Sequence, residues 1–91
     1  MRNIPQHITM RVIFSIQGQH DFDALPLTIR NRVAEVIERL THWPEVSGAK
    51  ALRGELAGKF RIRTGDWRVI FRVQDEVLII RIDHRSTIYE D

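Results

Sequence analysis

Hydrophobic residues change their spacing near Gly58, and this change most limits the folds that the chain can adopt. Before it, apolar residues recur every three or four positions, as on one face of a helix. After it, they alternate with polar residues, as in strands that bury one face. A helical part followed by a run of strands is typical of a small α+β domain. The helical stripe consists of Leu25, Ile29, Val33, Val36, Ile37 and Leu40.

The first half of the chain predicts one strand and one long helix. Residues 8–16 (ITMRVIFSI) are mostly β-branched or aromatic, which favours a strand, and the polar stretch 17–23 should end it. The helix should lie within LPLTIRNRVAEVIERLTHW, with Thr28 as a candidate N-cap and Pro44 marking its end. Residues 45–58 contain three glycines and predict a connector with at most one helical turn.

The second half predicts an antiparallel meander of three strands. Thr64-Gly65-Asp66 should form the turn after the first strand, because glycine accepts a positive φ angle. Gln74-Asp75-Glu76 should form the next turn, before a third strand over residues 77–83. The helix is expected to cover one face of this sheet.

The chain has 91 residues and no cysteine, so it has room for one domain that apolar packing alone must hold. Neither a disulfide nor a thiolate zinc site is available, and no cofactor or metal is expected. We expect a single domain over residues 8–91, preceded by a short leader over residues 1–7. The hydrophobic content of 43% makes such a core feasible.

Nothing in the sequence indicates a membrane protein. No stretch approaches the ~20 apolar residues that a membrane span needs, and residues 1–10 lack the apolar core of a signal peptide. The lack of cysteine also fits a reducing compartment. We therefore expect a cytoplasmic protein without membrane contact.

Basic residues gather in the segment 59–72, which contains five basic residues and one acidic residue. Strand alternation should place its arginines on the sheet face that points away from the helix. On the next strand, Arg81, Asp83 and Arg85 should lie on the same face. Like charges paired across strands destabilise a sheet by up to about 1 kcal/mol per pair, so some compensation is expected. The arginines of this segment are Arg61, Arg63, Arg68 and Arg72.

Two interpretations of this basic face remain open. The favoured one is a surface for an acidic partner or an anion, phosphate above all, because a guanidinium group can bind phosphate through two parallel hydrogen bonds. The alternative is a solvated face whose arginines form ordinary surface ion pairs, each contributing roughly 0 to 1 kcal/mol.

Four motifs over residues 52–89 follow one another at a characteristic spacing. LRGELAGKFRIRTGDWRVIFRV contains Leu-x-Gly, an aromatic residue with alternating basic residues, and Gly-Asp-aromatic-Arg-Val. VLIIRIDHRSTIY then supplies His-Arg and a closing Tyr. The arrangement resembles the RelE/ParE superfamily, the bacterial toxins of type II toxin–antitoxin systems. The resemblance implies an N-terminal strand and a helical hairpin before the meander, with LPLTIRNRVAEVIERL similar to the second helix of that hairpin.

The resemblance also implies an activity and partners. RelE-like members are endoribonucleases that bind mRNA in the ribosomal A site and promote its cleavage, which inhibits translation. ParE-like members poison DNA gyrase and have no established active site of their own. The ribonuclease is favoured here, because a phosphate clamp and a base-stacking ring in the His-Arg-x-x-x-Tyr ending have no use in a gyrase binder. The gyrase-binding toxin and a non-toxic homologue are the alternatives, and a cognate antitoxin is expected in each case.

The resemblance places this chain's candidate site residues at five positions. Arginine stays protonated at ordinary pH, so the arginines are cast as clamps on the scissile phosphate rather than as the general base. Tyr89 is expected to stack under a base of the substrate and so to hold the 2′-hydroxyl in line. The five positions are Arg61, Arg63, Arg68, Arg85 and Tyr89. Arg72 matches no functional position of the family.

The general base is the open question of the site. Histidine is the one side-chain type in these motifs that titrates near neutral pH, which makes His84 a candidate for proton transfer. His84 shares parity with Ile82, so a core-facing role is equally expected. Asp83, Glu90 and Tyr89 are weaker candidates. Ribonuclease members often carry lysine where this chain has Arg61 and Arg63, so a lysine base is not available at those positions.

Overall fold

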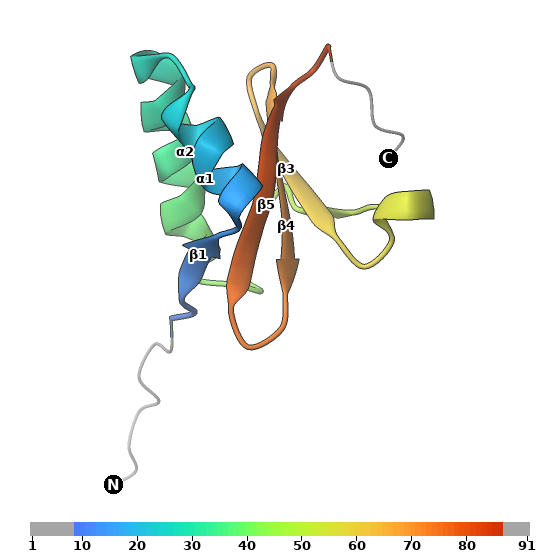
Figure 1. Cartoon of the computed structure of the whole chain (residues 1–91). Helices are drawn as coiled ribbons and strands as arrows, with labels where there is room; N and C mark the ends of the chain where they lie inside the picture. The colour runs from blue at the N-terminus through green and yellow to red at the C-terminus, as the bar shows by residue number, and fades with distance from the viewer. Residues whose placement is uncertain (1–8, 87–91) are drawn as a thin grey trace, which may run out of the picture.

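The computed structural model describes residues 9–86, so the expected leader, Tyr89 and Glu90 lie outside the described residues. Two helices, α1 and α2, lie together against one face of a five-stranded sheet, and the short 3-10 turn η1 lies on the other side (Figure 1). This arrangement confirms the α+β class. In chain order the elements are β1 (Val12–Phe14), α1 (Ile16–Asp23), α2 (Leu27–Leu40), β2 (Lys50–Ala51), η1 (Gly54–Leu56), β3 (Phe60–Thr64), β4 (Trp67–Val73) and β5 (Val77–His84).

The sheet has the order β1-β5-β4-β3-β2. Strands β3, β4 and β5 pair antiparallel, which confirms the expected meander. The two edges come from other parts of the chain, since β1 runs parallel to β5 and the two-residue β2 pairs antiparallel with β3. The turn between β3 and β4 contains Gly65 at a φ of 61°, the positive angle expected there.

Three local predictions in the first half were wrong. Among the described residues, the strand expected over residues 8–16 is limited to β1, and Ile16 already belongs to α1. The polar stretch after β1 is not a loop but helix α1, because Ser15 ends the strand and its Oγ accepts a hydrogen bond from the Gly18 amide at 2.9 Å. Helix α2 begins at Leu27 after an extended Pro26, so Thr28 lies inside the helix and does not cap it. The two helices together confirm the helical hairpin that the family resemblance implies.

Helix α2 supplies the helical side of the core. Its predicted stripe buries Val33, Val36 and Leu40 almost completely against the sheet. Beyond the end of α2, Trp43 packs edge-on against Phe60 and Phe71, with ring centroids 4.8 and 5.5 Å apart, and is partly buried against the core. The core therefore fills the space between α2 and the β3–β5 meander, and the opposite face of the sheet does not contact the helices.

Helix α1 takes the place of a strand along the outer edge of β5. After β1 ends, the Ser15 amide donates to Ile79 O at 2.9 Å and the Ser15 hydroxyl donates to Ile80 O at 2.8 Å. Farther along α1, Asp21 Oδ2 accepts the Ile82 amide at 2.9 Å. These bonds satisfy backbone groups of β5 that no strand reaches, and they fix β5 just before Asp83.

Replacing Asp21 by alanine is expected to lower the free energy of unfolding by about 1–3 kcal/mol, because the part-buried Ile82 amide loses its acceptor. Asp23→Ala is the matched control. Both carboxylates accept a hydrogen bond from a glutamine four residues earlier on α1, but only Asp21 reaches β5. Urea unfolding followed by circular dichroism measures the difference. Equal losses in the two variants would contradict the role given to Asp21.

Candidate functional site

Four arginines of the meander lie in two neighbouring rows across the sheet face that faces away from the helices. In the row nearest the β3–β4 turn, Arg63 pairs with Arg68, which pairs with Asp83. In the next row, Arg61 pairs with Ile70, which pairs with Arg81. The strand register therefore confirms the predicted parity of Arg61, Arg63 and Arg68, and of Arg81 and Asp83 on β5.

Arg61 differs from the other two arginines in its burial. It is only 6% exposed, whereas Arg63 is exposed and Arg68 half-buried. Its neighbour Ile70 is fully buried on this face although it lies outside the main core. Long arginine stems can cover such an apolar residue. Arg61 thus contributes to packing, and its role as a phosphate ligand stays a prediction.

Arg68 is held at some energetic cost. Its Nε atom is buried, with no hydrogen-bond partner among the described residues. Its cross-strand neighbour Arg63 carries the same charge, which weakens the pairing of β3 with β4. Groups that break local packing rules in this way are concentrated at functional sites.

Asp83 places one carboxylate among these cations. It lies directly opposite Arg68 on β5, and its Oδ2 is 3.4 Å from Arg81 Nε. The side chains of Arg81 and Asp83 are 36% and 20% exposed, so the pair is partly shielded from water. The negative charge of Asp83 therefore offsets part of the positive charge of the arginine rows.

Arg85 is brought to the same end of the sheet by the hairpin turn. Its amide donates to Asp66 O at 2.6 Å, and its Nη1 lies 3.6 Å from Asp66 Oδ1. Both side chains are mostly exposed, so the ion pair contributes no more than about 1 kcal/mol. The backbone bond is what sets Arg85 beside the β3–β4 turn, next to the row of Arg63 and Arg68.

His84 lies on the other face of the sheet. It pairs with Trp67 across β4 and β5, and the two rings meet edge to face with centroids 5.0 Å apart. Its Nδ1 is 3.1 Å from Ser86 Oγ. The structure thus brings Arg63, Arg68 and Arg85 together but not His84, whose part in proton transfer stays a prediction.

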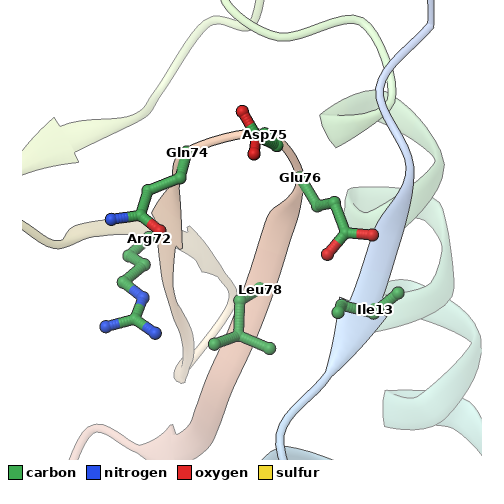
Figure 2. Close-up of a pocket in the computed structure, with 6 residues that line it drawn as sticks. All are labelled: Ile13, Arg72, Gln74, Asp75, Glu76 and Leu78. Carbon is green, nitrogen blue, oxygen red and sulfur yellow. The ribbon is translucent and has the colours of Figure 1, made fainter.

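Arg72 lies at the far end of the face, where it pairs with Leu78, the neighbour of Ile13 (Figure 2). An open pocket of about 140 Å³ lies there. Arg72 is thus separate from the Arg63–Arg68 row, as expected from its position in the sequence. The pocket is lined by Ile13, Arg72, Gln74, Asp75, Glu76 and Leu78.

The central position of Asp83 was underestimated from sequence, although its shared parity with Arg81 and Arg85 indicated that it lies on the arginine face.

Among residues 9–86 no three His, Asp or Glu side chains group closely enough to hold a metal ion. None of the described helices has the length and apolarity that crossing a membrane requires.

Comparison with known proteins gives the family. Residues 12–89 match the model of the family described as ParE toxin of type II toxin-antitoxin system, parDE. Toxin RelG of Mycobacterium tuberculosis is 40% identical over 82 residues, which cover 86% of this chain and 93% of RelG.

Solved structures agree with this match. A chain of the RelBE2 toxin–antitoxin complex of M. tuberculosis superimposes with a TM-score of 0.76 at 33% identity, covering 89% of this chain and 97% of the other. The isolated RelE toxin of Escherichia coli shares the fold, with a TM-score of 0.70 at 16% identity, covering 82% of this chain and 83% of RelE. With a family match over residues 12–89 and a 40% identical relative, the chain belongs to the RelE/ParE superfamily of type II toxin–antitoxin toxins.

Proposed function

We propose that this protein is a ribosome-dependent endoribonuclease that cleaves mRNA in the cytoplasm and so inhibits translation. The observation that carries the proposal is the row of Arg63 and Arg68 on the open sheet face, with Arg85 fixed beside it by the hairpin turn. Guanidinium groups spaced along a face suit the phosphates of an RNA strand, which they bind by charge-assisted hydrogen bonds.

The chemistry assigned to these arginines is charge stabilisation. When the 2′-hydroxyl attacks the adjacent phosphorus, negative charge builds up on the phosphoryl oxygens, and cations already in place stabilise it without reorganisation. Arg63, Arg68 and Arg85 are proposed to supply that charge. Tyr89 keeps its expected role of stacking under a substrate base.

A gyrase-binding toxin is the second candidate, because the family model that matches this chain is that of ParE. Expression in growing bacteria separates the two functions. A ribonuclease produces new mRNA 5′ ends within translated frames, whereas a gyrase poison produces gyrase-linked DNA breaks with intact mRNA. Growth arrest with DNA breaks and no new 5′ ends would refute the proposed ribonuclease.

A cognate antitoxin is the partner proposed for this chain in the cell. Several structural relatives were solved as toxin–antitoxin complexes, among them RelBE2 of M. tuberculosis and RelB-RelE of Methanococcus jannaschii. The cations of the open face suit an acidic or amphipathic antitoxin segment.

Binding of a short single-stranded RNA is expected to weaken by roughly 20-fold between 50 and 200 mM salt. The 20-fold value assumes three phosphate contacts, through Arg63, Arg68 and Arg85. Each contact adds about 0.7 to the slope of log affinity against log salt concentration. Fluorescence anisotropy with labelled RNA measures the slope, and Arg68→Ala should reduce it by about 0.7. An affinity that does not change with salt would count against phosphate contacts on this face.

A further inference from the structure

Asp83 is a carboxylate set among guanidinium groups, and its position suits a chemical role. We propose that Asp83 is the general base that takes the proton from the RNA 2′-hydroxyl. The inference rests on the proposed ribonuclease function and adds the one group that arginine clamps cannot supply, since arginine does not give up its proton in proteins.

The strand register places Asp83 close to where a clamped phosphate would lie. Arg68 pairs with Asp83 on one side and with Arg63 on the other, so the three side chains form one row on the open face. A phosphate held by Arg63 and Arg68 therefore has the carboxylate as its neighbour within the row. The 2′-hydroxyl that attacks belongs to the ribose on the 3′-oxygen of that phosphate. The bound phosphate therefore brings this hydroxyl close to the carboxylate of Asp83.

Four other titratable side chains of the described chain lie farther from the Arg63–Arg68 row or on the other face. His84 projects from the opposite face, toward Trp67. Asp66 lies at the hairpin tip, where its side chain is 60% exposed beside Arg85. Asp75 and Glu76 line the pocket at the far end of the sheet. Among residues 9–86, Asp83 is the carboxylate that lies within the arginine rows.

The carboxylate of Asp83 is in contact with Arg81. Arg81 Nε approaches one oxygen, Oδ2, at 3.4 Å. A carboxylate offers about four acceptor positions, so an ion pair through Oδ2 does not by itself prevent it from accepting a hydroxyl proton. The contact also orients the carboxylate, and with a side chain only 20% exposed Asp83 is partly shielded from competing water.

An Asp83 oxygen takes the 2′-hydroxyl proton and becomes the neutral acid, while the 2′-oxygen forms a bond to phosphorus. The bond between phosphorus and the 5′-oxygen breaks, and the 5′-oxygen leaves with the electron pair and takes a proton from water. The products are a 2′,3′-cyclic phosphate and a 5′-hydroxyl, and Asp83 then returns its proton to the hydroxide that formed.

A carboxylate that only neutralised the arginines would behave differently when removed. Loss of a negative charge beside Arg68 strengthens phosphate binding and leaves the chemical step intact or faster. Loss of a general base instead lowers the chemical step by about 100- to 10,000-fold, with binding unchanged or tighter. The two roles are therefore told apart by kcat and KM measured separately.

The test uses purified full-length toxin and ribosomes programmed with a defined mRNA. Asp83→Asn is expected to lower kcat at least about 100-fold with no rise in KM for the programmed ribosome. Asp83→Glu keeps a carboxylate, so its kcat should be at least about tenfold higher than that of Asp83→Asn. Asp75→Asn, which removes a carboxylate at the far end of the sheet, is the control and should cleave like the unmodified protein.

Urea midpoints are measured for every variant, to show which variants are folded. Asp83→Ser is prepared as well as Asp83→Asn, so that at least one folded variant without the carboxylate can be compared with the unmodified protein. Cleavage by that folded variant within a few-fold of the unmodified rate would overturn Asp83 as the base and leave the proposed ribonuclease standing. No cleavage by the unmodified protein would overturn both.

Discussion

Arg68→Ala is expected to slow mRNA cleavage by about 100- to 1000-fold, the usual loss when one stabiliser of transition-state charge is removed. Arg68 lies in the middle of the row on the open face, between Arg63 and Asp83. Its removal takes away a charge next to the proposed phosphate site and should leave the fold intact. The Nε atom makes no hydrogen bond to a described residue, and a repulsion from Arg63 disappears.

Arg72→Ala is the matched control for this prediction. Arg72 is on the same strand and the same face, but it lines the pocket at the far end. The rate of ribosome-dependent cleavage and the urea midpoint are measured for both variants. Equal rates in the two would show that position within the arginine rows is irrelevant, contrary to the site described here.

Gly18→Ala is expected to cost about 3 kcal/mol or more of folding free energy. A Cβ atom added at Gly18 would lie 2.3 Å from the carbonyl oxygen of Ile79, so α1 would have to move off β5. That movement strains the two hydrogen bonds by which Ser15 holds Ile79 and Ile80. Thermal unfolding should show a markedly lower midpoint or no cooperative transition.

Gly48→Ala serves as the comparison for Gly18. Gly48 has a φ of 89° and open space around its added Cβ, so alanine there meets backbone strain of about 1–2 kcal/mol without a steric clash. A Gly18 variant as stable as the Gly48 variant would contradict the close packing of α1 on β5.

The meander and the arginine face could be predicted because their signals are local. Alternation of side chains along a strand fixes which residues share a face, and Gly65 marks the turn that pairs β3 with β4. The stripe of α2 is local in the same sense, since Val33, Val36 and Leu40 recur at helical spacing.

Features that depend on contacts between distant segments could not be predicted in this way. The sequence of α1, IQGQHDFD, has no apolar stripe, and the helix is held by Ser15 and Asp21 acting on β5 more than sixty residues away. The burial of Arg61 likewise depends on its neighbours in the folded sheet, Lys50 and Ile70. Only the strand register shows that Asp83 lies opposite Arg68.

Analysis of the ends of cleaved mRNA tests the proposed function most directly. Purified protein is incubated with ribosomes that hold a defined mRNA with one codon in the A site. The proposed function predicts a cut within that codon, with a 2′,3′-cyclic phosphate upstream and a 5′-hydroxyl downstream, and no cut without ribosomes. Full-length mRNA after incubation with folded protein and programmed ribosomes would contradict it.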